Sequence, residues 1–172
     1  MKPDILVIWP NRPEQMAMLD AAYTLHRLDH AADPKALLAE VSDQITAVVT
    51  TGGKGLDAEM IRQLPNLQIV ASSGVGYDTI DIAACTERGI VVTNTPDVLT
   101  DDVADTAIML LLAARRQLVQ ADRYVRSGEW GRKGPYPLLS AMRGKRLGIV
   151  GLGRIGQAIA ARAAPMGCEI AY

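Results

Sequence analysis

A glycine pattern near the end of the chain restricts local structure more than any other feature of the sequence. Residues 147–150 form a short apolar run, and Gly151, Gly153 and Gly156 follow it in the spacing Gly-x-Gly-x-x-Gly. Residues 157–164 then have the composition of a helix. A strand, a glycine turn and a helix in this order are typical of a unit that binds a dinucleotide at the turn.

Each glycine of the turn has a separate mechanical task. Gly151 allows the tight corner after the strand, Gly153 lets the backbone approach a pyrophosphate, and Gly156 lets the helix pack closely on the sheet. The acid that reads the ribose is expected about 20 positions after the first glycine, at or beyond the end of the next strand, 168–172. Glu169 begins that strand and does not suit the role, because ligands bind at the carboxyl ends of strands. The alternative is a strand–helix turn without a ligand.

The composition excludes several classes of protein. With 172 residues, 49% of them hydrophobic, and a net charge of -1, the chain suits one globular domain or slightly more. It has no basic cluster, which argues against nucleic acid as a partner. The apolar run 107–114 is far below the ~18 residues that span a bilayer, and the run 5–9 is too short for a signal peptide. We therefore expect a cytoplasmic protein with no membrane association.

Neither the cysteines nor the histidines have metal-ligand spacing. Cys85 and Cys168 lie far apart, and we expect them to be reduced, buried thiols. His26 and His30 lie in a polar stretch without carboxylates at ligand spacing, and we expect them at the surface. No metal site is predicted.

Strand and helix patterns alternate from the start of the chain to residue 97. The expected strands are 5–9, 23–28, 47–50, 67–71 and 90–93, and the expected helices are 13–22, 34–40, 57–64 and 78–88. Asp78 is the expected cap of the last helix. This alternation predicts an α/β fold with a parallel sheet that is covered by helices on both faces.

The pattern changes at residues 94–96, Asn-Thr-Pro, which form a candidate hinge. Thr100 is expected to cap a long helix that runs to about Arg126, and the apolar segment 107–114 of this helix is expected to be buried. Residues 127–143 suggest an extended arm. The strand, helix and strand that follow have too little core for a complete domain, so we expect them to be part of a larger one.

Three motifs resemble those of one family, the D-isomer-specific 2-hydroxyacid dehydrogenases. They are SGVGYDTID at 73–81, NTPDVLTDDVAD at 94–105 and the glycine turn, and the likeness extends over the whole chain. The sequences GEWG at 128–131 and RGKRL at 143–147 are most similar to the glyoxylate/hydroxypyruvate reductase branch of that family.

The resemblance implies a domain organisation and a reaction. Residues 1–97 would be a flavodoxin-like substrate-binding domain, and residues 98–172 would supply the interdomain helix, the arm and the first βαβ of an NAD(P)-binding Rossmann domain. The reaction would be hydride transfer between a nicotinamide and a small 2-oxo acid, at a site between the domains. The branch favours NADP(H), with NAD(H) as the alternative. A homodimer is expected, because the arm and the apolar helix suit a symmetric interface.

The resemblance also implies binding residues. The backbone N–H groups of Val75 and Gly76 would hold the substrate carboxylate. Lys54 is a candidate from its position and not from the resemblance: it lies in the loop after a neighbouring strand and would attract the same carboxylate. Leu152, Arg154 and Ile155 would join the three turn glycines around the pyrophosphate. The alternatives are that Val75 and Gly76 form a turn without a ligand and that Lys54 is an ordinary solvated lysine.

Catalytic residues are not assigned within this chain. The arginine, glutamate and histidine that the family uses come after the glycine turn, and neither Arg115 nor Arg116 nor either histidine matches their motifs. Trp130 resembles a residue that, in this branch, reaches the active site of a neighbouring subunit, and packing at a dimer interface is its alternative role.

Three other readings of the sequence remain open. A phosphoglycerate dehydrogenase or another D-2-hydroxyacid dehydrogenase would share the fold, and a phosphorylated substrate would need a basic pocket. A non-catalytic, NAD(H)-sensing corepressor of the same fold would lack the catalytic histidine. The third alternative is that these 172 residues are the whole natural product, a truncated relic without activity.

Overall fold

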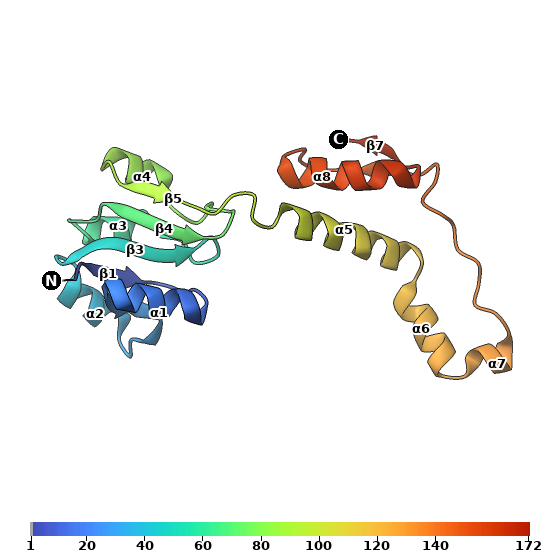
Figure 1. The fold of residues 1–172 in the computed structure, drawn as a ribbon, viewed down its shortest axis with the longest axis horizontal. Coiled ribbons are helices and arrows are strands. Elements are labelled where there is room, and N and C mark those ends of the chain that lie inside the picture. The colour runs from blue at the N-terminus through green and yellow to red at the C-terminus, as the bar shows by residue number, and fades with distance from the viewer. Residues whose placement is uncertain (1) are drawn as a thin grey trace. The chain divides into compact units, whose positions relative to one another are not determined.

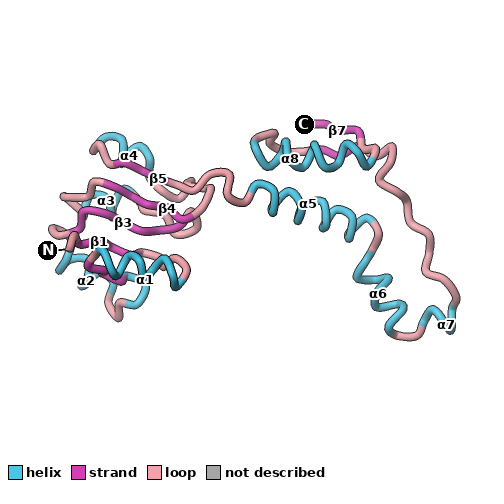
Figure 2. The backbone as a smooth tube through the Cα atoms, viewed as in Figure 1, coloured by secondary structure: helices cyan, strands magenta, loops and turns pink. Residues whose placement is uncertain are grey.

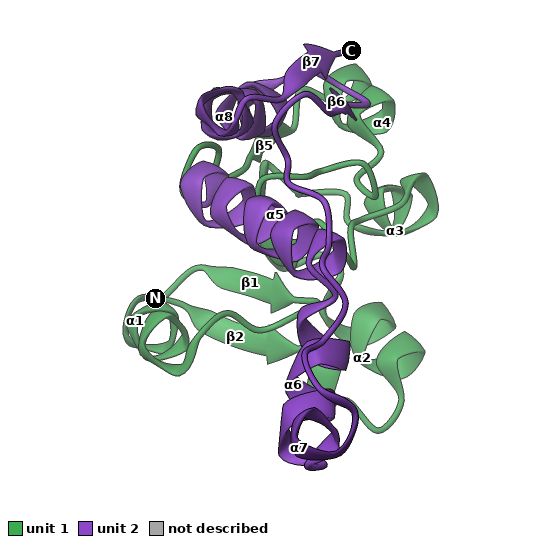
Figure 3. Ribbon diagram, turned by 90° about the vertical axis from the view of Figure 1, so that its right-hand side faces the viewer, with its two compact units in different colours: residues 1–98 green, residues 99–172 purple. Residues whose placement is uncertain are grey.

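The computed structural model describes residues 2–172, which form two compact units. Unit 1 comprises residues 1–98 and unit 2 comprises residues 99–172 (Figure 3). The first unit contains a complete parallel sheet, whereas the second contains a helical segment and a short βαβ (Figures 1 and 2).

Five parallel strands form the sheet of unit 1. They are β1 Asp4–Val7, β2 Thr24–Arg27, β3 Ile45–Thr51, β4 Ile69–Ser73 and β5 Val91–Thr93, in the spatial order β2-β1-β3-β4-β5. This is the flavodoxin-like order, in which the chain reverses its direction of winding between β1 and β3. The predicted α/β class and parallel sheet are confirmed.

Helices cover both faces of this sheet. They are α1 Pro13–Ala22, α2 Pro34–Val41, α3 Ala58–Gln63 and α4 Ile82–Glu87, and a 3-10 turn, Leu28–His30, precedes α2. On one face, α2, α3 and α4 pack around a core that includes Leu6, Val48 and Val70. On the other face, α1 packs on Ile5 and Val7. The alternation of side chains along a strand explains why neighbours such as Ile5 and Leu6 belong to different cores.

Two details of unit 1 differ from the prediction. The cap of α4 is Asp81, whose carboxylate accepts a hydrogen bond from the N–H of Ala84 at 2.9 Å, and not Asp78. The helix begins later because the chain first pairs with the loop after β3, where Leu56 bridges Ile80. The first strand ends at Val7, which leaves Trp9 in the following loop, 43% exposed.

Unit 2 begins with helices and ends with the short βαβ. Its elements are α5 Thr100–Arg115, α6 Leu118–Arg126, α7 Glu129–Lys133, β6 Arg146–Gly148, α8 Arg154–Ala163, a 3-10 turn Ala164–Met166 and β7 Glu169–Ala171. The two strands pair in parallel. Helices α5 and α8 lie side by side, and Arg162 of α8 reaches Asp101 at 2.8 Å and Asp105 at 2.5 Å on α5.

The predicted long helix is wrong in three respects. It is broken at Gln117, whose φ of 47° is left-handed, and the amide oxygen of this residue accepts a hydrogen bond from the Tyr136 hydroxyl. Thr100 lies inside the helix, which has no side-chain cap. The apolar segment is only partly buried, because Ile108 faces the interior while Leu110 is 58% exposed. The predicted arm also contains a short helix, α7.

The histidine prediction needs one correction. The ring Nε2 of His26 lies 2.8 Å from the carboxylate of Asp4, and the side chain is only 17% exposed, so it is a partly buried partner of β1 and not a free surface group. Within residues 2–172, no group of three or more His, Cys, Asp or Glu side chains could hold a metal ion. No helix in the same range has the length and apolarity to cross a membrane.

Candidate functional site

The loops that follow β3 and β4 are pressed together at the carboxyl edge of the first sheet. A Cβ atom added to Gly52 would lie 2.2 Å from the carbonyl oxygen of Gly76, which no side chain could tolerate. The Thr79 hydroxyl donates to the carbonyl of Gly52 at 2.6 Å and ties the second loop to the first. The contact explains why residue 52 is a glycine.

The end of β5 holds the β4 loop from the other side. The side-chain amide of Asn94 donates to the carbonyl of Val75 at 2.8 Å. Thr95 exchanges two bonds with Gly74, whose N–H donates to the threonine hydroxyl at 3.1 Å and whose carbonyl accepts from the threonine N–H at 2.9 Å. The sequence predicts a hinge at residues 94–96 and a family motif at 94–105, but it does not predict that Asn94 and Thr95 hold the β4 loop. Their position after a strand next to β4 was the signal that could have found it.

The held loop contains two backbone donors without a partner in the described part of the chain. Within residues 2–172, no hydrogen bond uses the N–H of Val75 or that of Gly76. Val75 is half-buried and Gly76 is exposed. Neighbouring backbone N–H groups without a partner are the kind of donors that backbone anion sites use, and a carboxylate is the simplest ligand of that kind.

Lys54 lies in the loop next to these donors, but its side chain turns toward β1. Its Nζ atom is 4.5 Å from the centroid of the Trp9 ring, which is within the range of a cation–π interaction. The structure therefore brings Lys54, Val75 and Gly76 to one edge of the sheet. It also adds Trp9, which sequence reasoning placed inside a strand.

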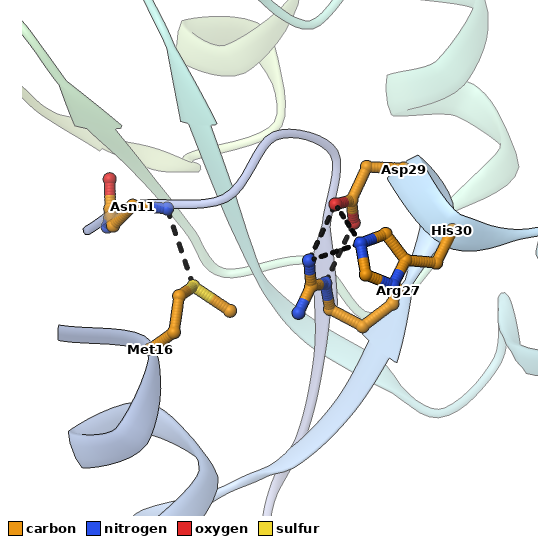
Figure 4. A network of polar contacts seen from close by, with 5 residues as sticks. All are labelled: Asn11, Met16, Arg27, Asp29 and His30. Atoms are coloured by element: carbon orange, nitrogen blue, oxygen red, sulfur yellow. Dashed lines mark hydrogen bonds and ion pairs between the residues drawn. The ribbon is translucent and has the colours of Figure 1, made fainter. Parts of the chain in front are cut away.

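Another cation near the end of β2 is already neutralised. The Arg27 guanidinium donates to both carboxylate oxygens of Asp29, at 2.8 and 2.6 Å. Figure 4 shows this pair with the ring of His30 beside it. The same view includes Asn11, whose N–H donates to the sulfur of Met16. The hydrogen bonds from the guanidinium lower the pKa of the Asp29 carboxyl, although its partial burial opposes the shift. The charge of Arg27 is therefore paired with Asp29, and this residue is not a candidate for binding the substrate.

The glycine turn of unit 2 has the geometry expected for its first and third glycines. Gly151 has a φ of 91°, which disfavours any side chain, and a Cβ on Gly156 would lie 2.2 Å from the carbonyl oxygen of Gly151. The helix α8 starts at Arg154, three residues earlier than predicted, with Gly153 as its N-cap. The turn and the helix N-terminus therefore coincide.

Gly153 is different, because nothing in the described chain requires a glycine there. Its φ is -74°, and a Cβ at this position would meet no atom within 4 Å. The open space faces the N-terminus of α8, where backbone N–H groups and the helix dipole favour a negative charge. Leu152 lies in the turn before this helix N-terminus, and Arg154 and Ile155 are the first residues of α8.

Trp130 and the two arginines that the sequence does not assign to the site lie elsewhere. Trp130 is on α7 and is half-exposed. Arg115 and Arg116 lie at the end of α5, and the Arg115 guanidinium is hydrogen-bonded to the Ser140 hydroxyl. Neither arginine is part of the glycine turn.

Known proteins give a consistent comparison. The sequence profile of the D-isomer specific 2-hydroxyacid dehydrogenase catalytic domain matches residues 5–166. The chain is 50% identical to glyoxylate/hydroxypyruvate reductase A of Arabidopsis thaliana over 154 residues. This aligned segment is 90% of this chain and 49% of the relative. The structure of a 2-hydroxyacid dehydrogenase from Ketogulonicigenium vulgare is similar with a TM-score of 0.90 and 47% identity, over 99% of this chain and 54% of the other.

A third relative was solved with ligands. The NADPH-dependent glyoxylate/hydroxypyruvate reductase from Sinorhizobium meliloti, in complex with NADP and malonate, is similar with a TM-score of 0.80 and 40% identity, over 100% of this chain and 53% of that one. The chain thus spans about half the length of the relatives it matches. The sheet order, the profile and these similarities agree: the chain belongs to the D-isomer specific 2-hydroxyacid dehydrogenase family.

Proposed function

We propose that the protein is an NAD(P)H-dependent reductase of small 2-oxo acids, with glyoxylate and hydroxypyruvate as substrates. The observation that supports this most is the pair of free N–H groups at Val75 and Gly76, held in place by contacts from both neighbouring loops. Relatives with this activity match the chain over nearly its whole length.

Each unit has its own part in this proposal. Residues 1–97 form the substrate-binding domain, in which Val75 and Gly76 bind the carboxylate and Lys54 adds positive charge to the same edge. Residues 98–172 supply the interdomain helix, the arm and the first βαβ of the coenzyme domain. There the turn from Gly151 to Gly156 binds the pyrophosphate.

The contribution of these residues to the reaction is binding and orientation. The reduced nicotinamide, when bound, supplies a hydride to the keto carbon. Fixing the substrate carboxylate on two backbone donors orients the keto group, and pre-orientation of this kind lowers the entropic part of the barrier. None of the residues assigned here acts as the proton donor.

Three finer properties belong to the same proposal. We favour NADP(H) over NAD(H), because a relative with 40% identity was solved with NADP. We propose a homodimer, which would cover exposed apolar side chains such as Leu118 and Val119 of α6. We also propose a cytoplasmic location, which suits the free thiols of Cys85 and Cys168.

The test is a steady-state assay of the full gene product. We expect oxidation of NADPH with glyoxylate and with hydroxypyruvate, and a lower kcat/KM when NADH replaces NADPH. A higher kcat/KM for 3-phosphohydroxypyruvate than for hydroxypyruvate would favour the phosphoglycerate dehydrogenase alternative. Tight NAD(H) binding without turnover of any 2-oxo acid would favour the corepressor alternative.

A further inference from the structure

The contact between Lys54 and Trp9 bears on which 2-oxo acids the site prefers. The ammonium lies 4.5 Å from the ring centroid, and Trp9 is 43% exposed, so the pair is open to solvent and not part of the core. Within residues 2–172, no carboxylate forms an ion pair with Lys54. Its positive charge is therefore available to a ligand.

The backbone on either side of this contact is fixed. The N–H groups of Lys54 and Gly55 both donate to the carbonyl of Thr51, at 3.1 and 2.9 Å, and the buried Thr50 hydroxyl donates to the carbonyl of Gly55 at 2.9 Å. The N–H of Ile8 donates to Val49 at 2.9 Å, which keeps the chain before Trp9 on the sheet. The two side chains thus meet from two restrained segments.

The strand order separates the ammonium from the carboxylate site. Along the sheet the strands run β1, β3, β4, so the loop of Lys54 lies between Trp9 on one side and Val75 on the other. Neighbouring strands are about 4.8 Å apart. The Trp9 ring holds the Lys54 ammonium on the β1 side of its loop. The ammonium is therefore directed away from the N–H groups of Val75 and Gly76 and does not bind the same carboxylate.

We propose that Lys54, positioned by the ring of Trp9, recognises a second carboxylate at the far end of the substrate. The inference rests on the proposed function and names a substrate class for the same site, the 2-oxo dicarboxylates. One carboxylate occupies the N–H groups of Val75 and Gly76, and the other meets the ammonium. A single exposed ammonium suits a carboxylate better than a phosphate dianion, which takes several charged donors.

The reaction itself is unchanged for such a substrate. The keto carbon receives a hydride from the reduced nicotinamide, its oxygen takes up one proton, and the product is the 2-hydroxy dicarboxylate with the oxidised cofactor. Trp9 is a positioning residue in this scheme, since it acts on the substrate only through Lys54.

The experiment compares two four-carbon acids in the full-length enzyme. Oxaloacetate and 2-oxobutyrate differ at the far end, which is a carboxylate in the first and a methyl in the second. Each is measured as a substrate and as a competitive inhibitor of hydroxypyruvate reduction. The selectivity is the ratio of the two kcat/KM values, or of the two inhibition constants if turnover is slow.

Replacing Lys54 should lower this selectivity. Lys54→Met is expected to reduce it about fivefold, through KM for oxaloacetate, because a partly exposed ion pair contributes little more than that. Trp9→Leu should reduce the selectivity about threefold, whereas Trp9→Phe, which keeps an aromatic ring, should keep most of it. The double variant Trp9→Leu/Lys54→Met should have the same selectivity as Lys54→Met alone. Lys2→Met, which removes the same charge at the amino edge of the sheet, should leave the ratio unchanged.

Several results would overturn the inference. Equal losses for both acids in Lys54→Met, additive effects of the two substitutions, or an enzyme that neither reduces nor binds oxaloacetate would each do so. If hydroxypyruvate is reduced normally in these cases, the proposed function survives. If hydroxypyruvate is not reduced at all, both proposals fail together.

Discussion

Two glycine loops in this chain look alike in sequence but differ in what requires their glycines. In unit 1, Gly52 and Gly55 are dictated by the protein itself, because a Cβ would lie 2.2 Å from the carbonyl of Gly76 in one case and 2.0 Å from that of Thr79 in the other. In unit 2, Gly156 is likewise dictated by its neighbours, but Gly153 faces open space. Gly153 differs from other open glycines because it is the N-cap of α8, where close approach of a ligand to the backbone would need a residue without a side chain.

The comparison predicts its largest effect on stability at Gly55. Gly55→Ala combines a left-handed φ of 70° with a backbone clash, so we expect the free energy of unfolding to fall by about 3 kcal/mol. Gly89→Ala is the matched control, because Gly89 has a φ of 67° but a Cβ there would meet nothing within 4 Å. Urea unfolding of both variants measures the difference, and equal losses would contradict the predicted clash.

Gly153 should show the opposite behaviour. Gly153→Val is expected to weaken cofactor binding about a hundredfold, or ~2.7 kcal/mol, because the added side chain would occupy the space of the pyrophosphate. The melting temperature without cofactor should hardly move, since the new side chain has room. Calorimetric titration with NADPH measures the affinity, and Gly131→Val serves as the control at another open position. An unchanged affinity would refute the assignment of the turn.

Gly76 lies between these two cases. Its Cβ would come within 3.4 Å of only the Asp78 carboxylate, an ordinary contact, so Gly76→Val should fold. We expect KM for hydroxypyruvate to rise about tenfold with little change in kcat, because a side chain would crowd the carboxylate on its two donors. Steady-state kinetics and thermal unfolding together decide the matter. A lower melting temperature with unchanged KM would mean that the loop is only structural.

The sequence predicted what depends on local pattern. Alternating strands and helices gave the parallel α/β sheet, and the glycine spacing gave the turn before α8. The cap of α4 was assigned to Asp78 instead of Asp81 because both aspartates suit a helix start, and only the bridge between Leu56 and Ile80 decides between them.

Features that depend on contacts between distant segments were missed. The break at Gln117 follows neither proline nor glycine, and its hydrogen bond to Tyr136 spans 19 residues. The bond from Asn94 to Val75 also joins residues 19 apart, and the contact between Trp9 and Lys54 joins two loops. No local periodicity reports on such pairs.

The smallest expected effect tests how firmly the first loop is held. Thr79→Val keeps the shape of the side chain but removes the hydroxyl that donates to Gly52 at 2.6 Å. Because one hydrogen bond contributes about 1 kcal/mol, the free energy of unfolding should fall by that amount and KM for hydroxypyruvate should rise about threefold. Thr86→Val is the control, since its hydroxyl bonds only within α4, to Ile82 at 2.7 Å. If both variants raise KM equally, the bond to Gly52 does not position the donors, and the two loops act independently.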